Sequence, residues 1–231
     1  MLRPYSFLIA AMILVYPYSL AQDHSKAQRP APSYGQPPPD LANALVQMAR
    51  TSHVPLIAEL VWPLPEIPTV EGVPLTPEKL NELLKKAPGY DWKMEGKTVH
   101  FYNKELRQAR FNFLNCKFRQ FMTPSNLSEM KLWFPGWPIG CLEGYPAVGG
   151  AISGFSDTML EKEQLQRETL ENVTALAALV YVANESPTFY TVLVFPSAMP
   201  TKRDAEQRVA WQWGSLNEKL GPIYTQPPAR K

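Results

Sequence analysis

Few side chains in this sequence could carry out covalent chemistry. It contains two cysteines, Cys116 and Cys141, and all three histidines (His24, His53 and His100) precede them. A catalytic cysteine needs a neighbouring base or positive charge that keeps it as a thiolate, and no motif of that kind surrounds either thiol. A structural disulfide is therefore the favoured interpretation, with two buried free thiols as the alternative.

Other catalytic and cofactor-binding motifs are also missing from the sequence. It contains no G-x-S-x-G, HExxH, CxxC or dinucleotide-binding fingerprint. His100 is expected on the polar face of a strand with no second ligand at a useful spacing, so a solvated side chain is favoured over a metal ligand. We predict no catalytic residue, no cofactor and no metal site; a hydrolase with dispersed active-site residues is the less favoured alternative.

An aromatic segment is the strongest candidate for a binding surface. The stretch KLWFPGWPIGCLEGYP contains four aromatic residues that are candidates for binding a partner or ligand: Trp133, Phe134, Trp137 and Tyr145. Aromatic side chains bury a large area at a small entropic cost, which suits recognition of a protein or of a sugar face. The alternative is an irregular core segment held by the two cysteines. Trp211 is likewise expected either to pack against these aromatic residues or to face a partner.

The composition indicates a globular protein. The chain has 231 residues, of which 45% are hydrophobic and 19% charged, and this length suits one domain or two small ones. A formal net charge of +2 gives no reason to expect nucleic acid or an anionic membrane surface as a partner.

The N-terminal residues predict export. Arg3 precedes an apolar stretch, Tyr5 to Leu20, that is short for a membrane span, and Ser19-Leu20-Ala21 resembles a signal-peptidase site. We predict a signal peptide over residues 1–21, with an uncleaved membrane anchor as the alternative, and hence a periplasmic or secreted protein. Residues 22–40 are rich in proline and polar residues, as is typical of a linker.

Residues 41–106 are predicted to form a small α+β module. Asp40 can cap a helix over 41–51, and Thr76 followed by Pro77 can begin a second helix that ends at Pro88-Gly89. A buried strand over 54–60 and a short strand over 69–73 lie between the helices. The alternation of apolar and polar residues over 90–102 predicts a hairpin.

This order of elements, with the phrases LANALVQMARTSHVPLIAEL and LTPEKLNELLKKAPGYDWKMEGKTVHFYN, resembles the short N-terminal domain of secretins and TonB-dependent receptors, the STN-type module. The positions that match the family pattern are Gly72, Thr76, Leu83-Leu84, Gly89-Tyr90, Trp92 and Val99. The loop 62–68 departs from that pattern because it is longer and richer in proline. The resemblance implies contacts with other envelope proteins, such as a secretin, a TonB-type component or a regulator.

Residues 107–220 are predicted to form a second, diverged α/β unit. Thr174 can cap a helix, and FYTVLVF (189–195) reads as a buried strand, so that the unit partly repeats the first. We expect a final helix from Thr201, because apolar residues recur at helical spacing, and then a flexible tail over 221–231. The resulting expectation is an α+β fold, a βαββαββ-like module followed by this unit.

The expected function is that of a non-enzymatic envelope protein that binds other proteins. The alternative is a periplasmic protein that binds a glycan, peptidoglycan or a small ligand through the aromatic segment.

Overall fold

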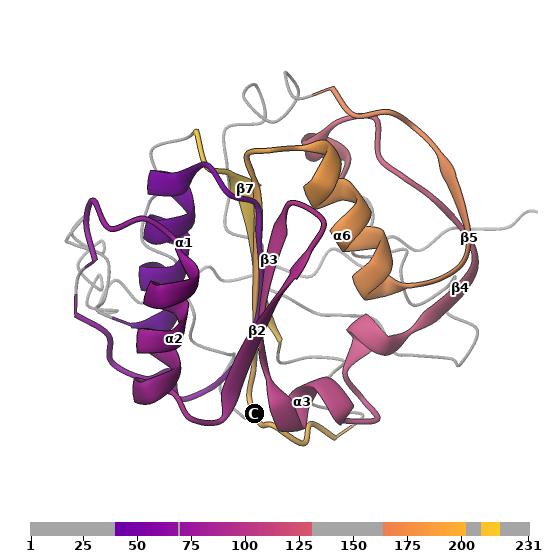
Figure 1. The fold of residues 1–231 in the computed structure, drawn as a ribbon. Coiled ribbons are helices and arrows are strands. Elements are labelled where there is room, and N and C mark those ends of the chain that lie inside the picture. Colours follow the sequence, from indigo (N-terminus) through magenta and orange to yellow (C-terminus); the bar gives the residue numbers. More distant parts are fainter. Residues whose placement is uncertain (1–39, 69, 131–163, 202–208, 218–231) are drawn as a thin grey trace, which may run out of the picture. The chain divides into compact units, whose positions relative to one another are not determined.

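The computed structural model describes residues 40–68, 70–130, 164–201 and 209–217, which form an α+β fold (Figure 1). Its five-stranded sheet has the order β2-β3-β1-β6-β7, and β4 and β5 form a separate antiparallel pair. The elements are α1 (Leu41–Ser52), β1 (Leu56–Val61), α2 (Pro77–Lys86), β2 (Tyr90–Glu95), β3 (Thr98–Asn103), α3 (Lys104–Gln108), η1 (Phe113–Asn115), β4 (Lys117–Met122), η2 (Leu127–Glu129), β5 (Thr169–Thr174), α6 (Ala175–Glu185), β6 (Phe189–Phe195) and β7 (Ala210–Ser215).

Local capping explains where the three longer helices begin. Asp40 accepts a hydrogen bond from the backbone N–H of Asn43 at 2.9 Å and so starts α1. Thr76 and Thr174 cap α2 and α6 in the same way, and Pro77 occupies the first turn of α2, where its missing N–H costs nothing. All three starts confirm what the sequence predicts.

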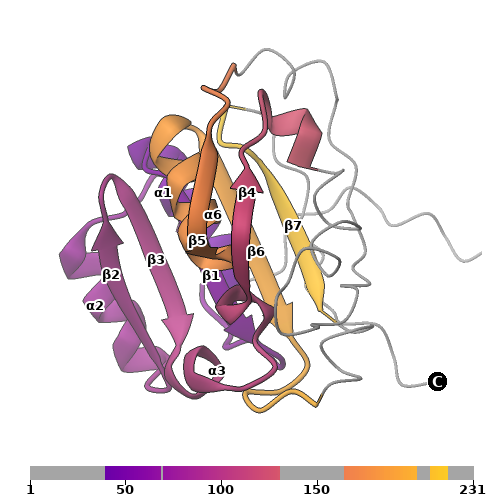
Figure 2. The same cartoon turned by 90° about the vertical axis from the view of Figure 1, so that its right-hand side faces the viewer.

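The central strand β1 is parallel to both of its neighbours, β3 and β6. Antiparallel strands β2 and β7 lie at the two edges of the sheet (Figure 2). Side chains alternate between the faces of a strand, so Leu56, Ala58 and Leu60 point to one face of the sheet and Ile57 and Glu59 point to the other. An acidic residue is therefore directed into the protein from the middle of the sheet.

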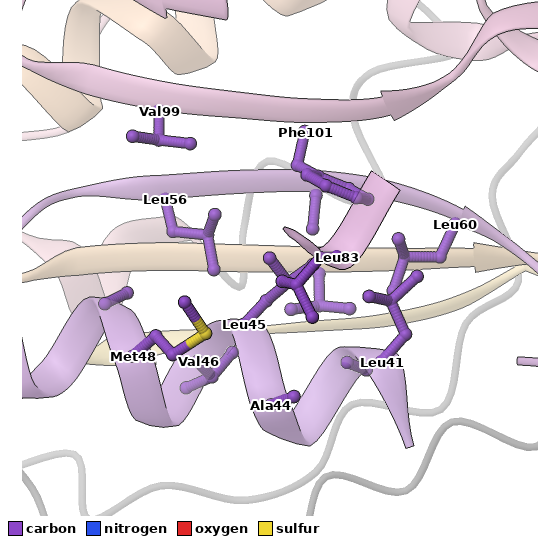
Figure 3. Packing of buried hydrophobic residues seen from close by; sticks show 14 of the residues in the cluster. Leu41, Ala44, Leu45, Val46, Met48, Leu56, Leu60, Leu83, Val99 and Phe101 are labelled. Carbon is purple, nitrogen blue, oxygen red and sulfur yellow. The ribbon is translucent and has the colours of Figure 1, made fainter. Parts of the chain in front are cut away.

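Helices cover both faces of the sheet (Figure 1). On one face α1 and α2 pack their apolar side chains against β1 and β3; Leu41, Leu45 and Met48 of α1 lie over Leu56 and Leu60 of β1 (Figure 3). On the other face, α6, η1 and the β4–β5 pair enclose a second core that includes Phe113, Leu193 and Trp211. Burying each of the leucines of α1 and β1 stabilises the fold by about 1.5–3 kcal/mol before entropic costs are counted.

Two expectations need correction. Val70–Val73 forms a turn, closed by a hydrogen bond from the Val73 N–H to the Val70 carbonyl at 3.0 Å, and not a strand. The expected final helix is wrong over Ala210–Ser215, which is strand β7. All six β7 residues are buried, so the strand shows no alternation that sequence periodicity could detect.

Strands from both sides of the expected boundary at residues 106 and 107 belong to one sheet. Strand β1, from the first expected unit, pairs along its whole length with β6 from the second, from Leu56↔Tyr190 to Val61↔Phe195. The helix-then-strand segments α1–β1 and α6–β6 therefore contribute to one sheet and cover its opposite faces.

In the described segments, no helix is long and apolar enough to cross a membrane.

Candidate functional site

A cluster of ionisable side chains lies inside the protein, on the face of the sheet that α6 and η1 cover. Glu59 of β1 and His100 of β3 are both fully buried, and Glu59 Oε1 lies 2.6 Å from His100 Nε2. The parallel register places Ile57 opposite His100, so the carboxylate reaches the imidazole diagonally across the two strands. A buried charge of this kind is tolerated only with a partner and hydrogen bonds.

The second carboxylate oxygen of Glu59 has its own donor. Asn112 is fully buried and donates Nδ2–H to Glu59 Oε2 at 2.6 Å and to the Leu106 carbonyl at 3.1 Å. Its own Oδ1 accepts the Leu114 N–H at 3.0 Å. Arg107 adds a cationic neighbour, with Nε 3.8 Å from Glu59 Oε1. The carboxylate thus ties the chain around α3 and η1 to the central strand.

The far side of the imidazole connects this cluster to the surface. His100 Nδ1 lies 3.3 Å from Glu95 Oε1, and Glu95 also pairs with exposed Lys93. Because both ring nitrogens face carboxylate oxygens, the imidazole satisfies both contacts only as the doubly protonated cation. Burial disfavours that cation, but the hydrogen bonds with Glu59 and Glu95 outweigh it and raise the pKa of His100. The hydrogen bond with His100 in turn lowers the pKa of Glu95 to about 2.

The prediction of a solvated His100 is therefore wrong. The alternation over 90–102 does place His100 on the polar face of β3, but α6 and its neighbours cover that face. Motif reasoning does not find Glu59, although a single acid within the apolar run LIAELV is a usable cue. General acid–base catalysis needs contact with a substrate, and Glu59 and His100 are both closed to solvent. Among the described residues, no group of three or more His, Cys, Asp or Glu side chains is placed to hold a metal ion.

An open pocket of 330 Å³ lies on the opposite face of the sheet, where α1 and α2 meet the loop before α2. Its floor and walls are apolar: Met48, Ile67 and Leu83 are buried, and Val70 and Val73 are half-buried. The remaining lining residues are Pro68, Lys79, Glu82, Lys85 and Lys86. This volume lies at the low end of the range for ligand pockets, roughly 300–1,000 Å³. We call this feature the α2 pocket.

Charged residues of α2 lie around the apolar floor because the helix is amphipathic. Leu80 and Leu83 point to the core, and the outward-facing positions carry lysine and glutamate. Lys79 Nζ forms an ion pair with Glu82 at 2.8 Å. This hydrogen bond lowers the pKa of Glu82, and the positive charges of Lys85 and Lys86 act in the same direction. The rim of the α2 pocket is therefore predominantly basic.

The structure describes only two of the candidate site residues that the sequence predicts, Trp211 and Cys116. Trp211 is 1% exposed in β7, its ring centre lies 5.3 Å from that of Phe113, and its indole N–H donates to Thr191 Oγ1 at 2.6 Å. It is a core residue in this structure and not an exposed binding residue. Cys116 is buried. The other candidates, Trp133, Phe134, Trp137, Tyr145 and Cys141, lie outside the described residues, so the disulfide and the aromatic binding segment stay predictions.

No family model, curated protein or solved structure matches this chain. The resemblance to STN-type modules accordingly stays a prediction from the sequence.

Proposed function

We propose that this chain is a non-enzymatic binding protein of the cell envelope and that a partner protein docks over the α2 pocket. The observation that carries the proposal is an open apolar pocket with a charged rim on a helix-covered face. Binding energy at protein interfaces concentrates where an apolar or aromatic anchor fills such a pocket, surrounded by polar contacts. The cellular location in this proposal comes from the N-terminal sequence.

The chain around the pocket is held in place, which favours binding. The Leu75 N–H donates to the hydroxyl of Ser52 at the end of α1, and so ties the residues before α2 to that helix. The Leu41 N–H likewise donates to the Pro65 carbonyl at 3.0 Å. A partner that docks on a preformed surface loses less free energy in ordering it.

Chemistry at the buried Glu59–His100 pair is a poorer basis for a function. Its polar atoms are satisfied by each other, by Asn112 and by Glu95, and no solvent reaches the reactive oxygen or nitrogen. The cluster is better explained as the tie between β1, β3 and the chain around η1.

A charge inside the α2 pocket tests the proposal. Val73→Asp would place a carboxylate on an apolar wall of the pocket. Val73 is only half-buried, so the core need not repack around the new side chain. Met122→Asp is the matched control, because Met122 is 59% exposed on β4. The tagged full-length chain and both variants would be captured from crosslinked envelopes, and their partners quantified by mass spectrometry.

We expect recovery of a secretin, a TonB-type component or their regulator with the wild type and with Met122→Asp, and at least a ten-fold loss with Val73→Asp. Thermal melts would show that both variants fold. Equal recovery of that partner with a folded Val73→Asp variant would refute the proposal.

A further inference from the structure

We infer that the segment docking in the α2 pocket is an acidic peptide segment, with an apolar side chain for the floor and carboxylates for the lysines of the rim. This inference rests on the proposed function, because it names the chemistry of the partner at the same pocket. The inference uses the positive sign of the rim charges, which the proposed function does not use.

The rim has more positive charge than its own acidic residue can neutralise. Three lysines and one glutamate line the pocket, and the glutamate, Glu82, is already paired with Lys79 at 2.8 Å. Lys85 and Lys86 are exposed, and neither makes an ion pair in the part of the chain that the structure describes. The ammonium groups of Lys85 and Lys86, beside the apolar floor, are therefore available to pair with acidic groups of a partner.

Helix stability accounts for part of this arrangement. Lysines in the last turn interact favourably with the partial negative charge at the C-terminal end of a helix. That effect explains the residue type but not the open apolar pocket next to it. A partner that fills the pocket must also cover part of the rim, and a neutral segment would remove water from the two ammonium groups without replacing their lost interactions.

The size of the pocket limits what enters it. A volume of 330 Å³ accommodates apolar side chains and not a folded element. The segment we infer therefore presents an apolar anchor with acidic residues beside it, as on one face of an amphipathic helix, where residues three or four apart are neighbours.

The test uses defined peptides on the isotope-labelled full chain, followed by NMR chemical-shift titration. One amphipathic peptide is built from leucine and glutamate, and its counterpart has glutamine in place of every glutamate. We expect the glutamate peptide to bind at least five-fold more tightly, with shifts centred on Val73 and Leu83. Because the Debye length falls from about 10 Å at 0.1 M salt to about 3 Å at 1 M, this preference should shrink as salt is added.

Charge reversal provides a second readout with a matched control. Lys85→Glu/Lys86→Glu should abolish the preference for glutamate, whereas Lys117→Glu/Arg119→Glu changes the net charge equally on exposed positions of β4 and should retain it. Equal binding of both peptides to the wild type, or no binding of either, would overturn the inference. If the peptide test fails but Val73→Asp still loses its partner in the capture experiment, the pocket binds a protein that is not acidic. Failure of this inference can thus be distinguished from failure of the proposed function.

Discussion

Replacing Glu59 by glutamine tests whether the buried ionic cluster holds the fold together. The carboxylate accepts from His100 at 2.6 Å through one oxygen and from Asn112 at 2.6 Å through the other. Glutamine has nearly the same size but only one oxygen, so in either orientation of its amide one of these donors faces an NH₂ group. The substitution also removes the anion beside the buried imidazolium.

The expected loss of stability is about 3 kcal/mol. Breaking a buried ion pair by removing one partner costs about 3–5 kcal/mol, and glutamine keeps one of the two hydrogen bonds, which places the estimate at the lower end. Urea unfolding followed by tryptophan fluorescence measures this loss, because Trp211 is buried in the core on the same side of the sheet. The slope of unfolding free energy against urea should stay unchanged, since the surface exposed on unfolding is the same.

The loss should also depend on pH. The folded-state pKa of His100 is raised, mainly because hydrogen bonds with Glu59 and Glu95 outweigh burial. Its contribution to stability is therefore fully present below the unfolded value, about 6.5, and is lost as the pH rises through the folded value. While the folded and unfolded chains differ by one proton, wild-type stability falls by up to about 1.4 kcal/mol per pH unit. Glu59→Gln should flatten this decline, so its penalty is largest near pH 6.

A control variant makes the result decisive. Glu171→Gln removes an exposed carboxylate on β5 and should change stability by less than about 0.5 kcal/mol. A loss below about 1 kcal/mol for Glu59→Gln, with the wild-type pH dependence retained, would refute the description of Glu59 and His100 as a buried ion pair.

Three further changes test separate parts of the fold by urea unfolding. Asn112→Ala leaves one oxygen of the buried carboxylate and the Leu114 N–H without their donor and acceptor and should cost about 2–3 kcal/mol; a loss under 1 kcal/mol would contradict this. Gly96→Ala should cost more than Gly72→Ala, because both glycines have positive φ (68° and 71°) but only at Gly96 would a Cβ lie 2.7 Å from the Asn184 side chain; equal losses would argue against that packing. Trp211→Phe removes the buried indole donor and should cost about 1–3 kcal/mol, whereas an unchanged midpoint would place that indole outside the core.

Local elements of the fold could be predicted because their causes are local. Asp40, Thr76 and Thr174 are caps whose effect extends over three residues, and the alternation over 90–102 matches the hairpin β2–β3. The helical stripe of α1 and the buried run of β6 likewise follow from periodicity and residue type alone.

Pairings between distant segments could not be predicted in the same way. The contact between Glu59 and His100 joins residues 41 positions apart, and it depends on the parallel pairing of β1 with β3. Whether the polar face of β3 is solvent-exposed or buried depends on α6, which follows some seventy residues later along the chain. The α2 pocket likewise needs α1, α2 and the loop before α2 in their final positions, which the local pattern of α2 does not supply.

Site-specific photo-crosslinking in intact cells tests whether a partner protein docks at the α2 pocket. A photoreactive residue at position 73, inside the α2 pocket, is compared with the same residue at position 122, which is exposed on β4. We expect a crosslinked adduct with an envelope component of a secretin or TonB-type assembly from position 73 and none from position 122. The same adduct from both positions, or from position 122 alone, would contradict docking at the α2 pocket.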